Sequence, residues 1–181
     1  MIEDRLLIWK FKHGSSDALS RIYEKYKNSL LKVACGLLND SAAAEDIVHD
    51  CFVSLAQSPE KLRLNGNLKS YLATSAANRA RNWNSAKQRR ETAGLNDVDS
   101  AATDSKRPDQ WIIANERLKR LNDALARIPY EQREVIILHL QGEMKFRTIA
   151  KSQNVSINTV QSRYRYGLEK LRSILDTEAE L

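Results

Sequence analysis

Apolar residues recur at intervals of three and four along nearly the whole chain of 181 residues. This spacing is typical of helices that bury one face. The clearest stripe follows the series i, i+3, i+4, i+7, i+8, i+11 and consists of Ala44, Ile47, Val48, Cys51, Phe52 and Leu55. The chain has only three prolines and six glycines, which argues against a turn-rich all-β fold. We therefore predict an all-α protein.

Capping and helix-breaking residues divide this pattern into segments. Ser15 or Ser16 can cap a helix that runs to about Leu38, and a second helix starts near Ser41. Residues 58–67 carry the proline, glycine and asparagines of a loop. Asn67 can cap a long helix whose apolar stripe reaches Trp83. After residue 110, one helix resumes at about residue 111, and another begins at Pro129 and stops at Gly142.

Residues 91–110 contain few large apolar side chains and many Asp, Ser and Ala residues. This composition is typical of a flexible linker. We therefore predict two small helical domains, residues 1–90 and 111–181, joined by an acidic flexible linker over residues 91–110.

The basic residues are concentrated in two blocks, although the net charge is only +6. Residues 61–90 hold eight basic and no acidic residues, and residues 145–172 hold seven basic residues and one acidic residue. The linker between them holds five acidic and two basic residues. A protein that binds a polyanion at two places would show this pattern. Two solvated basic surfaces are the alternative.

The second basic block predicts a helix-turn-helix. Residues 145–151 fit a short helix, Asn154 tolerates a left-handed turn, and Ser156 can cap a second helix. The second helix is expected to bury Val160, Tyr164, Leu168 and Leu171. Its outward-facing residues, our candidates for DNA contact, are Asn158, Thr159, Gln161, Ser162, Arg163, Arg165 and Tyr166.

These outward-facing residues suit a helix that lies in the major groove. Arg can bind guanine with two hydrogen bonds, Asn or Gln can bind adenine, and Ser or Thr can reach phosphate. The alternative is a helical hairpin with a charged surface and no DNA-binding role.

The sequence also disfavours several classes of protein. The two cysteines do not form a CxxC pair, and with three scattered histidines they give no metal-ligand spacing. We therefore expect no metal, no other cofactor and no catalytic residues. Neither His13 nor His139 has an evident catalytic partner, so we do not expect an enzyme. The longest purely apolar run, residues 135–138, is far shorter than the roughly 20 residues of a membrane span. With no signal-peptide stretch at the N-terminus, we expect a cytoplasmic protein.

Two strings carry a resemblance to a known family. The string AEDIVHDCF, with the basic helix LKSYLATSAANRARNWNSAKQRR after it, resembles the promoter-melting domain of extracytoplasmic-function (ECF) sigma factors of bacterial RNA polymerase. The string INTVQSRYRYGLEKLR resembles the recognition helix of their C-terminal domain. The resemblance covers most of the chain in the family's order, with the linker in the corresponding place.

The resemblance implies a surface that binds core RNA polymerase. In the family, the AED helix docks on the clamp helices of the largest polymerase subunit. The corresponding face here, spaced i, i+3, i+4, i+7, is Asp46, His49, Asp50 and Val53. Two carboxylates facing a basic partner would provide steering and register. His49 stands where relatives commonly carry Gln.

The resemblance also implies a surface that melts the downstream promoter element. The loop from Leu62 to Asn67 would hold an extruded base, and the basic helix would hold the separated strand. Trp83 belongs either to the core or to this stacking surface. The candidate residues are Asn65, Asn67, Asn78, Arg81, Asn82, Trp83, Lys87, Arg89 and Arg90.

The predicted function is therefore that of an ECF sigma factor, which binds core polymerase and directs promoter recognition and transcription initiation. Its expected partners are core RNA polymerase (the clamp helices and the flap region), promoter DNA in double- and single-stranded form, and an anti-sigma factor, without membrane insertion. The acidic linker would either thread the active-site cleft and the RNA exit channel or act as a plain tether. A stand-alone helix-turn-helix transcriptional regulator is the alternative function.

Overall fold

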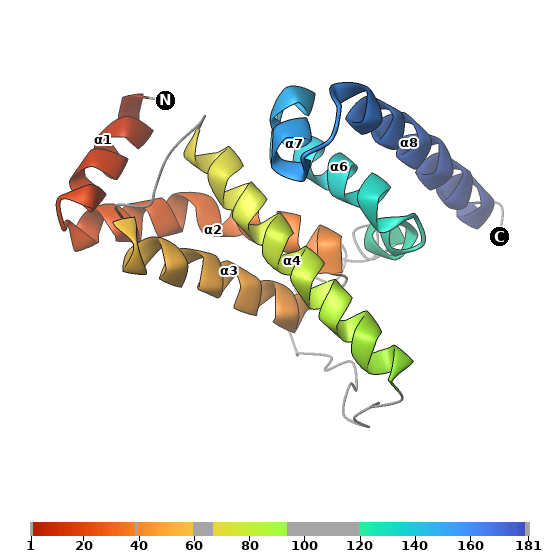
Figure 1. Ribbon diagram of the computed structural model, residues 1–181, viewed down its shortest axis with the longest axis horizontal. Helices are drawn as coiled ribbons and strands as arrows, with labels where there is room; N and C mark the ends of the chain where they lie inside the picture. Colours follow the sequence, from red (N-terminus) through yellow and green to blue (C-terminus); the bar gives the residue numbers. More distant parts are fainter. Residues whose placement is uncertain (1, 39, 60–66, 94–119, 180–181) are drawn as a thin grey trace.

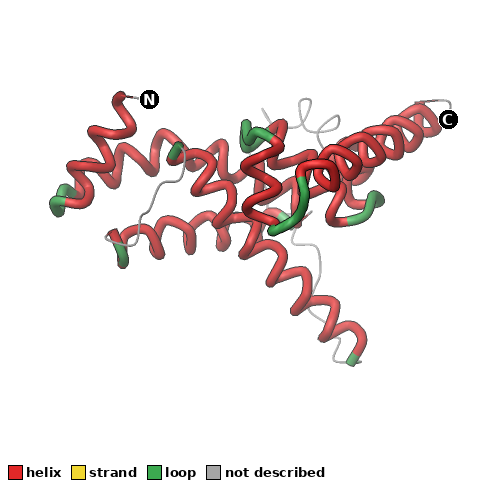
Figure 2. The backbone as a smooth tube through the Cα atoms, turned by 45° about the horizontal axis from the view of Figure 1, so that its top comes forward, coloured by secondary structure: helices red, strands yellow, loops and turns green. Residues whose placement is uncertain are grey.

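A computed structural model describes residues 2–38, 40–59, 67–93 and 120–179. Within these ranges the regular secondary structure is helical, and the residues between the helices form turns, bends and short connections (Figure 2). The helices are α1 (Ile2–Lys12), α2 (Ser16–Leu38), α3 (Ser41–Gln57), α4 (Leu68–Thr92), α6 (Tyr130–Leu140), α7 (Phe146–Gln153) and α8 (Ile157–Ala179). Residues 120–126 are also helical. The prediction of an all-α protein with two helical domains is confirmed.

Helices α1 to α4 form the first domain, in which α2, α3 and α4 pack against one another (Figure 1). The predicted stripe of α3 is buried throughout, including Cys51 at 2% exposure. Burial raises the pKa of the Cys51 thiol, which disfavours the reactive thiolate. Cys51 therefore acts as a small apolar core residue. On α2, Ile22, Tyr26, Leu30, Val33 and Leu37 are buried, whereas Leu19 is half-buried and Tyr23 is 38% exposed.

Side-chain caps fix where α3 and α4 begin. The Asp40 carboxylate accepts a hydrogen bond from the Ala43 amide at 3.0 Å, so the N-cap of α3 is Asp40. The Asn67 side-chain oxygen accepts a hydrogen bond from the Ser70 amide at 2.7 Å, as the sequence predicted. Each cap satisfies one of the free amides at a helix start. Helix α4 continues to Thr92, two residues beyond the predicted end of the domain.

Helix α1 is not among the helices that the sequence predicts. Three of its residues, Leu7, Ile8 and Phe11, are buried, and a polar cluster ties its start to α2. Lys25 donates hydrogen bonds to Glu3 and Asp4 at 2.6 and 2.8 Å, and the Tyr26 hydroxyl donates one to Asp4 at 2.8 Å. Partial burial pushes the pKa of Asp4 upward, but the hydrogen bonds from Lys25 and Tyr26 outweigh this effect and lower it.

This cluster should make stability depend on pH. A carboxylate whose pKa is lowered by folding stabilises the folded state above its unfolded pKa, and loses this contribution as the pH falls through the folded value. We expect Asp4→Asn to lower the free energy of unfolding by about 1 kcal/mol at pH 7. The difference from the wild type should shrink as the pH falls below 3.8, the ordinary value for Asp. Urea denaturation at pH 7 and at a series of acidic pH values measures this difference, and a difference independent of pH would contradict it.

Helices α6, α7 and α8 form the second domain. Asn154 follows α7 in the left-handed conformation (φ 53°) and ends that helix. The Ser156 hydroxyl accepts a hydrogen bond from the Thr159 amide at 3.0 Å, which caps α8. Helix, turn and cap agree with the predicted helix-turn-helix. Pro129 is the N-cap of α6 rather than its first residue.

One predicted core position in α8 is wrong. Leu168 is 36% exposed, whereas Val160 and Leu171 are buried and Tyr164 is half-buried as predicted. The residue that faces the interior beside Tyr164 is Gly167. A Cβ atom at this position would lie 2.8 Å from Cδ1 of Ile136, closer than two carbon atoms can pack. Glycine therefore lets α6 approach α8, and Leu168 lies at the edge of the buried face.

Candidate nucleic-acid interface

The start of α8 presents a polar surface. Asn158, Gln161, Ser162 and Arg165 are exposed and line a shallow hollow on this helix. Tyr166 is 51% exposed, and the Arg165 guanidinium lies 4.8 Å from the centre of its ring. Thr159 is half-buried and belongs to the N-cap, since its hydroxyl lies 2.8 Å from that of Ser156.

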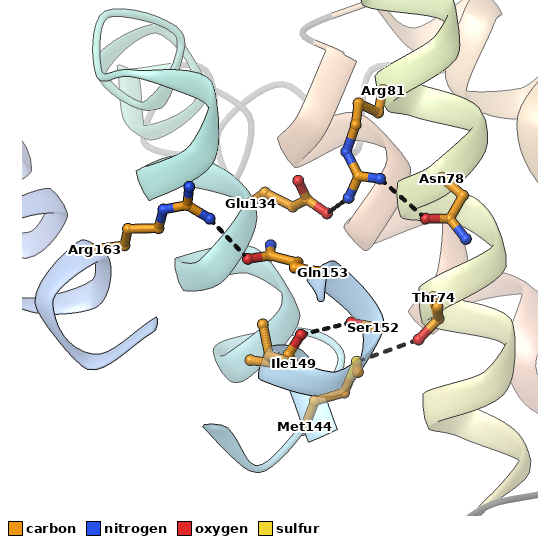
Figure 3. A network of polar contacts seen from close by, with 9 residues as sticks. All are labelled: Thr74, Asn78, Arg81, Glu134, Met144, Ile149, Ser152, Gln153 and Arg163. Carbon is orange, nitrogen blue, oxygen red and sulfur yellow. Dashed lines mark hydrogen bonds and ion pairs between the residues drawn. The ribbon is translucent and has the colours of Figure 1, made fainter. Parts of the chain in front are cut away.

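Arg163 differs from the other residues of this surface because it is half-buried. Its guanidinium donates a hydrogen bond to the Gln153 side-chain oxygen at 3.1 Å (Figure 3). Gln153 is the last residue of α7, so this bond joins the two helices of the helix-turn-helix. It restricts the orientations of the Arg163 side chain, which reduces the entropy that this side chain would lose on binding DNA.

Aromatic side chains hold the helix-turn-helix on α6. The His139 ring stacks on Phe146 with the ring centres 4.4 Å apart, and it meets Tyr164 edge-on at 5.1 Å. Nδ1 of His139 lies 2.8 Å from the Met144 carbonyl oxygen. A carbonyl oxygen only accepts, so Nδ1 carries the proton in this bond. His139 therefore has a structural partner, and its place in this cluster is that of a packing residue.

The basic helix α4 carries a second polar surface. Asn82, Lys87, Arg89 and Arg90 are exposed, and the C-terminal part of α4 projects beyond the neighbouring helices (Figure 1, Figure 2). Arg89 donates a hydrogen bond to the Ser85 carbonyl oxygen at 3.2 Å, within its own helix. The basic residues near the end of α4 thus stand on a helical arm.

The other α4 candidates make contacts within the protein. Arg81 donates a hydrogen bond to Asn78 at 3.2 Å and pairs with Glu134 of α6 at 2.5 Å (Figure 3). Trp83 is half-buried against the core, and the Lys87 ammonium lies 5.2 Å from its ring centre. The indole therefore packs against the core, one of its two predicted environments, and its role in a stacking surface stays a prediction. The side-chain oxygen of Asn67 is occupied by its capping bond. Asn65 and most of the predicted loop lie outside the described residues, as does the predicted linker from residue 94 onward.

The face of α3 opposite the core is polar. Asp46, His49 and Asp50 are exposed and Val53 is half-buried, so the structure brings the four predicted residues to one side of the helix. Arg79 of α4 reaches the edge of this face, with its guanidinium 3.6 Å from the Asp50 carboxylate and hydrogen-bonded to the Ser54 hydroxyl. The spacing of these residues in the sequence does not predict this contact. Asp46 and His49 have no such neighbour among the interactions of the described residues.

Sequence and structure comparisons identify the family. The family models "Sigma-70 region 2" and "Sigma-70, region 4" match residues 22–90 and 118–171. The ECF RNA polymerase sigma factor SigW of Bacillus subtilis is 24% identical over 97% of both chains. The RNA polymerase sigma factor CarQ of Myxococcus xanthus is 27% identical over 92% of this chain and 94% of its own. This chain belongs to the ECF sigma factors.

Solved structures share the fold of this sigma factor. The sigma factor RpoE from Bartonella quintana, in complex with the anti-sigma factor NepR, superposes with a TM-score of 0.69 at 22% identity, covering 87% of this chain and 96% of its own. CnrH, in complex with the cytosolic domain of CnrY, gives a TM-score of 0.70 at 19% identity, covering 97% and 98%.

Family membership confirms the predicted function. The chain is a sigma factor of transcription initiation and carries the DNA-binding regions of that family. Sigma factors are not enzymes. In the described part of the chain, no three His, Cys, Asp or Glu side chains lie where they could hold a metal ion. None of the helices there has both the length and the apolarity needed to cross a membrane.

Proposed function

We propose that this ECF sigma factor uses three separate surfaces, one on each of α3, α4 and α8. The exposed face of α3 binds core RNA polymerase at the clamp helices of its largest subunit. Helix α4, with the loop before it, opens the downstream promoter element and holds the single strand. The start of α8 binds the upstream element as duplex DNA in the major groove.

The observation that carries this proposal is the presence of two separate cationic helices in one sigma-factor chain. Arg and Lys side chains neutralise phosphates and release counterions, which provides most of the affinity for nucleic acid. On α4, the exposed basic end lies close to the half-buried Trp83 ring, and a basic groove with an aromatic ring is suited to single strands. On α8, polar residues precede Arg163 and Arg165, and Asn, Gln and Arg side chains are suited to hydrogen bonds with base edges.

The partners follow from the same proposal. The chain consists of a core-binding and melting domain (1–90), a linker (91–110) and an upstream-binding domain (111–181). The whole chain acts in the cytoplasm and binds core polymerase, including its flap region. The sigma factor RpoE from Bartonella quintana, which has a similar fold, was solved with the anti-sigma factor NepR bound. An anti-sigma factor is therefore the proposed negative regulator of this chain, and its binding would compete with core polymerase.

Run-off transcription with a promoter library tests the function. Purified core polymerase should produce specific transcripts only when this chain is added, and the selected templates should share an upstream and a downstream element. The same duplexes incubated with the chain alone provide the control. Tight, sequence-specific duplex binding without polymerase, together with no specific transcripts with polymerase, would contradict the proposal and favour a stand-alone regulator.

A further inference from the structure

Helix α1 exposes two large apolar side chains that the packing of the first domain does not use. Leu6 is 52% exposed and Trp9 is 58% exposed, and the two side chains lie about one helical turn apart. The buried side of the same helix is provided by Leu7, Ile8 and Phe11. Trp9 is the most exposed large apolar residue in the described part of the chain.

The indole ring of Trp9 is held in place by His13, which lies four residues further along the chain. The centres of the two rings are 4.4 Å apart. Nδ1 of His13 lies 2.7 Å from the Trp9 carbonyl oxygen, and since a carbonyl oxygen only accepts, Nδ1 donates this hydrogen bond. A side chain that is already restrained loses less entropy when a ligand binds to it. Trp9 therefore offers a restrained aromatic surface to solvent.

The charged residues of α1 make the surroundings of Trp9 positive. Both acidic residues, Glu3 and Asp4, are paired with Lys25 of α2, at 2.6 and 2.8 Å. Three exposed cations of α1 have no ion-pair partner among the residues that the structure describes, namely Arg5, Lys10 and Lys12. At 100° per residue, one of these cations lies on one side of Trp9 around the helix and two lie on the other. We call Leu6, Trp9 and these three cations the Trp9 face.

An exposed aromatic ring between unpaired cations is suited to single-stranded nucleic acid. Bases stack on aromatic side chains, and cations follow the phosphate backbone. A membrane surface would need a larger apolar face, but three large apolar side chains of α1 are buried in the protein. A symmetric contact between two copies would bring like charges together. Charge and shape therefore favour unpaired bases as the occupant.

The position of α1 agrees with this occupant. In both views, α1 lies at the end of the first domain where α3 ends and α4 begins (Figure 1, Figure 2). The proposed melting surface consists of α4 and the connection between α3 and α4. A strand that is separated at the start of α4 can therefore continue toward α1.

We propose that the Trp9 face is a further binding site for single-stranded promoter DNA, in which a base stacks on the indole and the cations contact neighbouring phosphates. The proposal rests on the proposed melting role of the first domain and extends the single-strand surface from α4 to α1. Every base has a face that can stack, so this site adds affinity for the open strand without adding base preference.

Two substitutions of Trp9 separate stacking from simple apolar contact. Trp9→Leu keeps an apolar side chain without a ring, and Trp9→Phe keeps an aromatic ring. Fluorescence anisotropy measures the affinity of the full chain for a labelled single strand of about 15 nucleotides. Trp9→Leu should weaken binding by about fivefold or more, and Trp9→Phe by less. Leu140→Ala, at a residue of α6 that is 54% exposed, is the matched control and should leave the affinity unchanged.

The salt dependence of binding tests the cations of the Trp9 face. In the triple variant Arg5→Gln, Lys10→Gln and Lys12→Gln, the slope of log affinity against log salt concentration should decrease by about 2, because each phosphate contact with a single strand releases counterions. Arg21→Gln is the matched control, since Arg21 is an exposed cation of α2 that is already paired with Asp17 at 3.4 Å. Its slope should equal that of the wild type. All substituted side chains are exposed, and circular dichroism checks that each variant keeps its helices.

Photo-crosslinking locates the site in the working complex. With p-benzoylphenylalanine in place of Trp9, holoenzyme on an open promoter should crosslink to a base within the melted region. Crosslinks to duplex DNA or polymerase alone, no measurable binding of the oligonucleotide by the wild type, or wild-type affinity in Trp9→Leu would overturn the proposal. Trp9-dependent binding to phosphatidylglycerol vesicles with unchanged oligonucleotide affinity would also overturn it and assign the face to lipid. If the wild type gives no specific transcript with core polymerase, the proposed function fails, and the oligonucleotide affinities still decide whether the Trp9 face binds single strands.

Discussion

Asp46→Lys combined with Asp50→Asn is expected to weaken binding to core RNA polymerase by about 2 kcal/mol, or roughly thirtyfold. Both carboxylates are exposed on the same side of α3, so they are available to a basic partner. Reversing one charge and neutralising the other replaces attraction with repulsion at that surface. Asp50 is neutralised rather than reversed because Arg79 lies 3.6 Å away, and a lysine at position 50 would repel it.

Glu45→Lys is the matched control for this prediction. Glu45 is an exposed acidic residue adjacent to Asp46 on the same helix, and its side chain is directed about 100° away around the helix axis. Fluorescence titration of labelled sigma factor with core polymerase measures the affinity, and circular dichroism confirms the fold of each variant. Equal loss of affinity in Glu45→Lys and in the double variant would indicate a general charge effect and would contradict the assigned face.

Arg163→Ala is expected to weaken holoenzyme binding to the upstream element by about 1–3 kcal/mol, or fivefold to 150-fold, and to relax base preference there. Arg163 lies near the start of α8, and its hydrogen bond to Gln153 restrains its guanidinium. Gln153→Ala keeps the arginine and removes this restraint, so it should cause a smaller loss. Mobility-shift titrations with single-base variants of a selected promoter measure both the affinity and the preference.

The control on the same helix is Arg172→Ala. Arg172 is 85% exposed and pairs with Asp176 at 3.6 Å, more than two helical turns beyond Arg163. Its removal should leave the base preference unchanged. If Arg163→Ala lowers affinity for all sequences equally, the Arg163 side chain contacts phosphate instead of a base, and the assigned register of α8 along the groove is wrong.

Local sequence patterns predicted most of the helices and several of their boundaries, although they did not predict α1. The stripe of α3, the caps at Asn67 and Ser156 and the left-handed Asn154 depend on residues within a few positions of one another. Helical periodicity and capping act over this same range, so they are visible in the sequence. Leu168 was assigned to the core because it also fits the period, but the period alone does not locate the edge of a buried face.

The sequence predicts which residues share each candidate surface, but it does not predict what their side chains contact. That Asp46, His49, Asp50 and Val53 share a side of α3 follows from their spacing and is found in the structure. That Arg81 is paired inside the protein, and that Arg163 is tied to Gln153, does not follow from any spacing. One signal was present in the sequence, since Glu134 stands directly before the longest apolar run, where a buried carboxylate would need a cation.

The sequence by itself determined an all-α chain with a helix-turn-helix and two basic blocks, because hydrophobic period, caps and charge are properties of neighbouring residues. The tertiary structure decided what those helices contact. Arg81 and Glu134 are 53 residues apart, and Ile137 meets Gly36 across the two domains. A helical period shows that a face is buried without showing which element buries it, because that depends on how complementary surfaces pack in three dimensions.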